Sequence, residues 1–385
     1  MIPPTDGQPD RLPQTLAALT RGIEAGLHTG AQAYVSRGGE VVADFAVGMA
    51  RPGVPMRRDS LTAWMSAGKP LAAVAFAQLW EQGLLDVDDP VARHVPEFAA
   101  RGKEAVTIRH LLTHTGGFRA LVGKWEDQPW DAIVAAVCDA RLEPGWVPGR
   151  KAGYHLATSW YVLGEIVRRL DPGRRDYGRY VREMICGPLG MNDSWVGMPA
   201  GVYSEYGDRI AVTPDAARGA NPQAADGGGS DLSNATSTRP GSGARGPVRE
   251  LGFFYEMLLG KGERNGVRVL SPQAAEALVA GHRIGMYDHT FRHVMDWGLG
   301  FILNSARYGA DTVPYGYGPH ASPRTFGHGG SQCCTGFADP ENQLAVAIAW
   351  NGRPGEAAHD RRLRETLAAV YEDLGLAPTP SAGTG

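Results

Sequence analysis

Lysine and cysteine are both scarce in this chain of 385 residues, and the scarcity of cysteine argues against a disulfide scaffold and a zinc site. The four cysteines, at positions 138, 186, 333 and 334, are too few for a disulfide scaffold at this length. They also form no CxxC or Cys/His cluster with the spacing of a zinc site. We therefore expect no metal and no cofactor, and we interpret Cys333 and Cys334 as buried thiols. The 38 basic residues include only five lysines: Lys69, Lys103, Lys124, Lys151 and Lys261.

Long apolar runs and an excess of one charge are also missing. No apolar run approaches the roughly 18 residues that a membrane-spanning helix needs. The first six residues carry neither the basic nor the apolar region of a secretory signal. A net charge of −3 argues against a nucleic-acid binder, because such proteins present a strongly basic face. These absences predict a cytoplasmic protein with small-molecule partners, which binds neither nucleic acid nor membrane.

Apolar periodicity divides the chain into three parts. The first predicts a helix over 11–27 and a strand pair over 31–36 and 40–47. The second is mostly helical, although residues 214–247 are rich in Gly, Ala, Ser and Pro, lack periodicity and predict a long loop. The third contains short strand-like runs and a final helix over 356–374. Helices are expected over 66–85, 130–140, 159–170, 248–259 and 272–280, and strands over 298–304, 325–330, 335–339 and 344–350.

This order predicts an α+β fold. Strands from both ends of the chain can pair into one antiparallel sheet flanked by terminal helices, with the helical part inserted between them. We expect residues 1–60 and 290–376 to form this discontinuous sheet domain and residues 61–289 to form the mostly helical domain. The tail, residues 377–385, is expected to be disordered.

Candidate chemistry begins at Ser66 and Lys69, which stand three residues apart at the start of a predicted helix and so share one face. A serine hydroxyl is a weak nucleophile until a base takes its proton, and a desolvated lysine with a lowered pKa can do so. The helix N-terminus adds a potential that favours developing negative charge. Alone, this S-x-x-K spacing is a weak signal.

Two further segments add to it. Tyr154 precedes the helical run 159–170, and a tyrosine beside a lysine can relay a proton. Residues 326–331 read Phe-Gly-His-Gly-Gly-Ser, and such glycines let a backbone N–H approach a ligand closely. Each segment alone is more typical of packing or of an ordinary turn.

In this order and spacing the three segments resemble the S-x-x-K, Y-x-N and K-T-G motifs of the serine β-lactamase and penicillin-binding-protein superfamily. The chain is most similar to the class C β-lactamase-like branch, which includes carboxylesterases and natural-product transacylases. Residues 85–91, 107–117, 297–301 and 337–340 are similar to further family segments, so the resemblance covers roughly residues 20–375.

The resemblance implies a role for each matching position. Ser66 would be the nucleophile, Lys69 its partner, and Tyr154 the general base in acylation and the proton donor to the leaving group. The backbone N–H groups of Ser66 and Ser331 would form the oxyanion hole. Substrate-binding positions are expected at His328, Gly329, Gly330, Leu156 and Trp160.

Two departures from the family pattern bear on the substrate. Leu156 stands where the second motif carries an asparagine that binds the amide of β-lactam side chains, so a hydrogen-bonding partner is lost. His328 replaces the lysine of the third motif, and imidazole is mostly neutral at pH 7. Both changes point away from antibiotic carboxylates and towards uncharged esters or thioesters.

The sequence therefore predicts a carboxylesterase or a transacylase that forms an acyl-Ser66 intermediate. A transacylase would pass the acyl group from an ester or thioester to an amine or alcohol, and we expect it to act in secondary metabolism. A β-lactamase or D,D-peptidase is the alternative enzyme. A non-catalytic binding protein on the same scaffold is a third interpretation, against which the intact Ser66, Lys69 and Tyr154 set argues.

Overall fold

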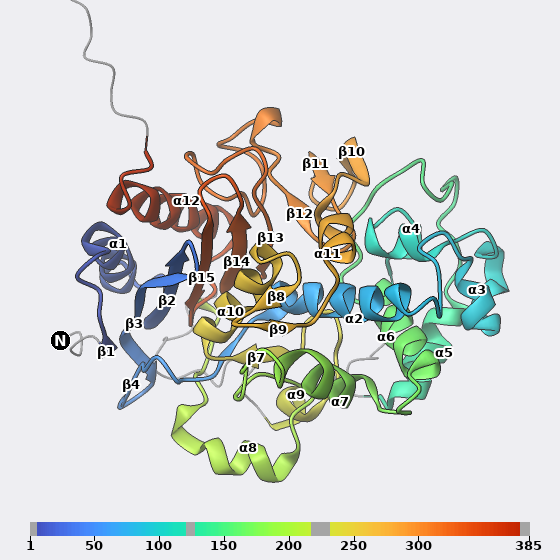
Figure 1. Cartoon of the computed structure of the whole chain (residues 1–385), viewed down its shortest axis with the longest axis horizontal. Coiled ribbons are helices and arrows are strands. Elements are labelled where there is room, and N and C mark those ends of the chain that lie inside the picture. Colours follow the sequence, from blue (N-terminus) through green and yellow to red (C-terminus); the bar gives the residue numbers. More distant parts are fainter. Residues whose placement is uncertain (1–5, 121–127, 217–231, 378–385) are drawn as a thin grey trace, which may run out of the picture.

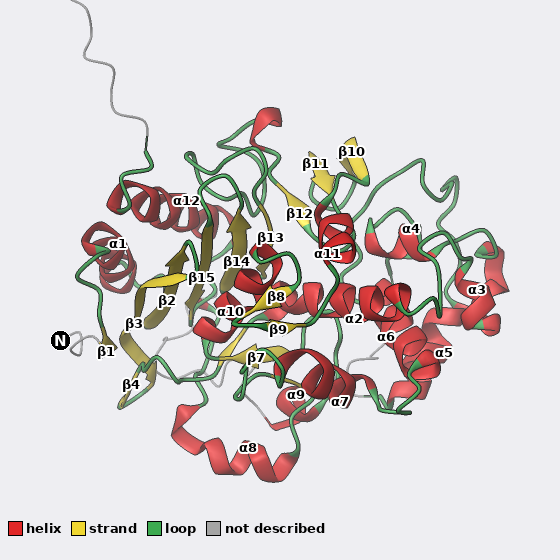
Figure 2. Ribbon diagram, in the orientation of Figure 1, coloured by secondary structure: helices red, strands yellow, loops and turns green. Residues whose placement is uncertain are grey.

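The computed structural model describes residues 6–120, 128–216 and 232–377. Helices and strands segregate within it, with most long strands gathered beside the terminal helices and the shorter helices on the opposite side (Figure 2). The helices are α1 (Pro13–Glu24), α2 (Lys69–Glu81), α3 (Val91–His94), α4 (Ile108–Leu112), α5 (Trp130–Asp139), α6 (Thr158–Leu170), α7 (Tyr177–Val181), α8 (Ala200–Tyr206), α9 (Leu232–Thr236), α10 (Val248–Leu259), α11 (Pro272–Val279) and α12 (Glu356–Asp373). Shorter helical turns are η1 (Met65–Gly68), η2 (Pro96–Gly102), η3 (Arg182–Cys186), η4 (Gly207–Arg209) and η6 (Ala306–Tyr308).

The strands form one large antiparallel sheet and two small ones. The large sheet has the order β1-β3-β2-β15-β14-β13-β12-β11-β10, with β4 paired to β3. Its strands are β1 (Asp6–Gly7), β2 (Gly30–Arg37), β3 (Glu40–Arg51), β4 (Val54–Pro55), β10 (Arg283–Asp288), β11 (His293–Trp297), β12 (Ile302–Leu303), β13 (Phe326–Gly330), β14 (Cys334–Asp339) and β15 (Leu344–Trp350). The small sheets contain β5 (Thr62–Ala63), β6 (Trp195–Val196) and β7 (Ala244–Gly246), and β8 (Glu263–Arg264) with β9 (Val267–Arg268).

The two ends of the chain meet at the centre of the large sheet. Strand β15 pairs with β2 in a register that sets Leu344 opposite Arg37 and Trp350 opposite Ala31. Both strands are almost wholly buried, because α1 and α12 cover one face while α10 packs against β2, β14 and β15. In Figure 1 the N-terminal blue helix α1 and the C-terminal red helix α12 lie side by side. The discontinuous sheet expected from the sequence is therefore present.

Helix α2 passes through the middle of the helical part, where it contacts α6, α7 and α11 (Figure 1). Eleven of its residues, from Lys69 to Leu79, are buried. A helix that is apolar on all sides needs cover all round, and here neighbouring helices provide it. The segment that carries the candidate nucleophile is thus held in the core of the molecule. None of the helices in the described ranges combines the length and the apolar character needed to cross a bilayer.

Several predicted boundaries need correction. The sheet resumes at Arg283 rather than at about residue 290, through β10 and β11, which the sequence did not indicate. The loop predicted over 214–247 contains α9 and β7, while its residues 217–231 lie outside the described ranges. Most of the tail predicted to be disordered, residues 378–385, also lies outside them. The four cysteines are free and buried, as expected for Cys333 and Cys334.

Candidate active site

Ser66 lies in the short turn η1, directly before α2. The preceding residue, Met65, has a φ of +50°, a conformation that costs energy for a residue with a side chain. Such strain is found where a backbone must present a group in one direction. Strand β13 lies against this turn: a Cβ on Gly330 would come within 2.0 Å of the carbonyl oxygen of Trp64. Glycine at position 330 is therefore required for the strand to approach the nucleophile.

Lys69 begins α2 and its side chain is fully buried. Its Nζ lies 2.9 Å from Ser66 Oγ and donates hydrogen bonds to the carbonyl oxygens of Leu156, at 3.0 Å, and Gly241, at 2.6 Å. Burial lowers the pKa of Lys69 well below its usual value, because the ammonium is removed from water. A neutral amine at hydrogen-bonding distance from a serine hydroxyl is the arrangement that a general base requires.

Tyr154 also lies beside Ser66, and its ring centroid is 5.0 Å from Lys69 Nζ. Burial raises the pKa of Tyr154 well above its usual value, and a hydrogen bond with Ser66 opposes this shift. The phenol thus keeps its proton at neutral pH. This charge distribution favours Lys69 as the base in acylation, a role that the sequence analysis assigned to Tyr154.

His328 projects from β13 into the same site and is 1% exposed. Its Nδ1 lies 2.7 Å from the carbonyl oxygen of Gly329, and burial, followed by the nearby Lys69, lowers its pKa to about 3. A neutral imidazole whose Nδ1–H donates to a carbonyl leaves Nε2 as an acceptor. That Nε2 has no hydrogen-bond partner among the described residues. His328 therefore cannot attract a carboxylate as the family lysine does, but it can accept a hydrogen bond from a substrate.

The turn after β13 carries Ser331 and is held from α12. Gln332, with a φ of +61°, donates from Nε2 to Glu356 at 2.9 Å, and its Oε1 accepts from the N–H of Gly355 at 2.7 Å. The buried guanidinium of Arg362 donates to the carbonyl oxygen of Gln332. Both the side chain and the backbone carbonyl of Gln332 are therefore held in place. These contacts also fix the neighbouring backbone N–H of Ser331, which we expect in the oxyanion hole.

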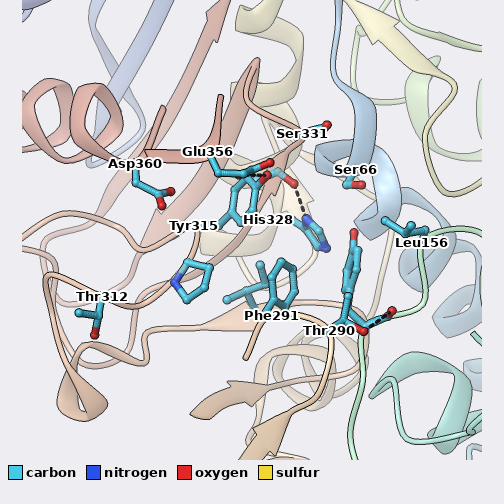
Figure 3. Close-up of a pocket in the computed structure, with 14 residues that line it drawn as sticks. Ser66, Leu156, Thr290, Phe291, Thr312, Tyr315, His328, Ser331, Glu356 and Asp360 are labelled. Carbon is cyan, nitrogen blue, oxygen red and sulfur yellow. Dashed lines mark hydrogen bonds between the residues drawn. The ribbon is translucent and has the colours of Figure 1, made fainter. Parts of the chain in front are cut away.

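A pocket with a volume of about 510 Å³ opens beside the nucleophile (Figure 3). Ser66, Tyr154, Leu156, His328, Gly329 and Ser331 all line it, so the structure brings together most of the residues that the sequence singled out. Leu156 lines this pocket and is 66% exposed, so its apolar side chain is open to a substrate.

Trp160 lies differently from the prediction. It is fully buried, its indole N–H donates to the carbonyl oxygen of His155, and its ring centroid is 5.5 Å from Lys69 Nζ. The ring does not line the described pocket and instead helps to exclude water from the lysine. We therefore withdraw Trp160 as a substrate contact.

Two residues that hold the catalytic groups by hydrogen bonds were not predicted from the sequence. The carboxylate of Asp288, at the end of β10, accepts hydrogen bonds from the backbone N–H groups of Tyr154, Thr290 and Phe291 at 2.9 to 3.1 Å. Gly241, which accepts from Lys69, comes from the segment predicted to be a long loop. Neither residue belongs to a motif, and each is more than 130 positions from the catalytic residue it contacts, Tyr154 for Asp288 and Lys69 for Gly241.

A serine paired with a buried lysine, beside strand β13 of the antiparallel sheet, defines a serine hydrolase or acyltransferase. The family model described as Beta-lactamase matches residues 17–370, and the chain belongs to this family.

Its relatives include hydrolases and a transferase. The chain is 26% identical to the esterase/beta-lactamase LipL of Mycobacterium tuberculosis over 77% of its own length and 71% of LipL. It is 30% identical to the monacolin J acid methylbutanoyltransferase of Aspergillus terreus, over 36% of this chain and 38% of that one. Among solved structures, a family VIII carboxylesterase superposes with a TM-score of 0.80 at 28% identity, covering 97% of this chain and all of the other.

Proposed function

We propose that Ser66 forms an acyl-enzyme with an uncharged ester or thioester, and that the acyl group then passes to water, an amine or an alcohol. The observation that carries this proposal is the 2.9 Å contact between Lys69 Nζ and Ser66 Oγ, at a lysine whose other partners are two carbonyl oxygens. The ester-hydrolysing and acyl-transferring relatives support the same chemistry.

Acylation would proceed in three steps. Neutral Lys69 takes the proton of Ser66 Oγ as that oxygen attacks the carbonyl carbon. The N–H groups of Ser66 and Ser331 stabilise the oxyanion. When the tetrahedral intermediate collapses, Tyr154 gives its proton to the leaving group, and the Lys69 ammonium restores the phenol. Deacylation reverses these transfers with water or an acceptor in the place of the leaving group.

The charges of the pocket support uncharged substrates. Its described lining residues include no lysine or arginine but two carboxylates, Glu356 and Asp360. A β-lactam or a cell-wall peptide would bring its own carboxylate into this field and be repelled. The exposed side chain of Leu156 favours an apolar acyl group. We place the activity in the cytoplasm and in secondary metabolism, with a small acyl donor and acceptor as partners.

Intact-mass spectrometry tests the proposal. Wild-type protein incubated with p-nitrophenyl butyrate should gain the mass of one butyryl group, and Ser66→Ala should not. Turnover of the variant should fall by several orders of magnitude. An adduct that persists in Ser66→Ala would refute the assignment, and no adduct in either protein would favour the binding-protein interpretation. Rapid hydrolysis of nitrocefin would favour a β-lactamase.

Adding amines and alcohols to the same reaction separates transfer from hydrolysis. A bound acceptor has a large effective concentration, so a transacylase should show a saturable yield of new ester or amide as free acid falls. If no acceptor in a broad panel diverts the acyl group, ester hydrolysis alone stands.

A further inference from the structure

The end of the pocket away from the nucleophile is acidic. Glu356 and Asp360 stand four residues apart in the first turns of α12, and both line the pocket that contains Ser66. In Figure 3 Asp360 lies across the pocket from Ser66 and Leu156, with Tyr315 and Phe291 between them. Two carboxylates on one face of a helix repel each other unless a cation lies near.

Apart from the N-terminal end of α12, the described residues supply little compensation for this charge. Glu356 accepts hydrogen bonds from Tyr315 and Gln332, which are neutral donors. Asp360 has no hydrogen-bond or ion-pair partner among the described residues. Burial and the adjacent Glu356 raise its pKa, while Arg364 opposes the shift from one helical turn away. The described lining of the pocket contains no basic residue, so a cation from outside would meet the two carboxylates with only Arg364, outside the lining, opposing them.

A second, independent feature points to a ligand in the same pocket. His328 is 1% exposed, and its Nε2 is an acceptor without a partner in the described residues. A buried acceptor left unpaired costs free energy that a ligand donor would recover. The ring centroids of His328 and Tyr154, which would serve the leaving group, are 6.1 Å apart. On the other side of His328, the neighbouring Gly329 packs against the ring of Tyr315, whose hydroxyl donates to Glu356. The leaving-group side of a substrate therefore extends from Tyr154 past His328 towards Asp360.

We infer that the leaving group, and in the reverse direction the acyl acceptor, carries an organic cation that binds between Tyr315, Glu356 and Asp360. This inference rests on the proposed acyl-Ser66 chemistry and names a substrate class for it: esters of alcohols that bear an ammonium group. The hydroxyl end of such an acceptor first donates to His328 Nε2 as it binds; it then turns the same proton to Tyr154, and on attack the Lys69–Tyr154 pair takes this proton. The bond between the acyl carbon and Ser66 Oγ then breaks, and the proton returns to Oγ. The aromatic face of Tyr315 adds a cation–π contribution.

The test compares esters matched in shape. Butyryl esters of ω-(trimethylammonio)alcohols are paired with esters of the ω-tert-butyl alcohols of the same chain length, from two to five methylenes, and hydrolysis gives kcat/KM for each. Wild type should prefer the cationic ester at one or two lengths by about fivefold or more, the effect of a partly exposed charge contact with an aromatic partner. Asp360→Asn should lower that ratio towards one, and Asp360→Lys should invert it.

The control is Glu365→Gln, which removes an exposed carboxylate from the same helix outside the pocket lining and should leave the ratio unchanged. Circular dichroism shows whether each variant is folded. Equal kcat/KM for both esters at every length, or a ratio unchanged in both Asp360 variants, would overturn the cation subsite. These outcomes differ from failure of the proposed function, in which p-nitrophenyl butyrate would leave no butyryl adduct on Ser66.

Discussion

The position of the proton at the active site depends on what surrounds Lys69. An ammonium and a neutral amine could both satisfy the hydroxyl and the two carbonyl oxygens around Nζ, so hydrogen-bond geometry alone does not choose between them. No carboxylate among the described residues pairs with this lysine, and its side chain is fully buried. An unpaired buried charge is expensive, so the neutral amine is favoured and its lone pair faces Ser66.

The pH dependence of the reaction should therefore follow Lys69. The deprotonated amine is the active form, so kcat/KM for p-nitrophenyl butyrate should be high above the folded-state pKa and fall as the pH drops through it. Because burial lowers this pKa, the ascending limb should lie well below the value of about 10.4 usual for lysine. A limb near pH 10, or one that survives in Lys69→Ala, would contradict this assignment.

Lys69 and Tyr154 should also behave as one proton-transfer unit. Lys69→Ala and Tyr154→Phe should each lower kcat/KM by about 10²- to 10⁴-fold, the usual worth of general acid–base catalysis. The double variant should be little worse than either single one, because the proton path is already broken. Steady-state kinetics on the three variants measures the coupling, and losses that multiply would show that the two side chains act independently.

At the scale of elements, the sequence predicted those whose apolar pattern matched their burial. Strand β15 and helices α2 and α10 are long apolar or periodic segments, and the structure contains them close to the expected bounds. Strand β10 was missed because its pattern is inverted: Arg283 and Asp288 are buried, whereas Ile284 and Tyr287 are exposed. A prediction that assigns apolar residues to the buried face of a strand cannot recognise a strand whose buried residues form an ion pair.

That ion pair connects the missed strand to the site. Arg283 Nη2 lies 3.1 Å from Asp288 Oδ2, while Asp288 Oδ1 accepts the backbone N–H of Tyr154. Asp288→Asn should destabilise the protein by about 3–5 kcal/mol, because removing one partner leaves the buried arginine without its ion pair. Arg283→Met in the same chain should recover much of that loss. Urea denaturation of both single variants and the double variant gives the coupling, and strictly additive effects would show that the pair does not act together.

At the scale of the whole molecule, the candidate site could be predicted only where its residues stand close together in the sequence or match a motif of the family. Ser66 and Lys69 are three residues apart, and the resemblance supplied Tyr154, His328 and Ser331. The groups that hold them could not be predicted, because Gly241 and Asp288 meet their partners only through the tertiary fold. The carboxylates of α12 were missed for the same reason, since a helix that closes the sheet also forms one end of the pocket.

A buried carboxylate between two parts of the chain makes global stability depend on pH. Glu250, in α10, is 3% exposed and accepts hydrogen bonds from the N–H of Asp193 and the hydroxyl of Ser194. Burial raises its pKa to about 7, and these hydrogen bonds only partly oppose the shift. In the unfolded chain it titrates near 4.3. The folded state therefore binds the extra proton, and the stability that Glu250 contributes is fully present at low pH and is lost as the pH rises through about 7.

Replacing Glu250 with glutamine should remove this dependence. Between pH 5 and pH 8 the wild type should lose on the order of 2–3 kcal/mol more than Glu250→Gln, because a shift of one pKa unit corresponds to about 1.4 kcal/mol. Thermal unfolding at both pH values measures the difference, and the exposed Glu365→Gln serves as the matched control, which should follow the wild type. The buried amide keeps an acceptor oxygen for Ser194 without a charge to desolvate, so Glu250→Gln should gain on the wild type as the pH rises. Parallel curves for all three proteins would mean that Glu250 does not titrate in this range, and that the contact between α10 and residues 193–194 stays in one protonation state.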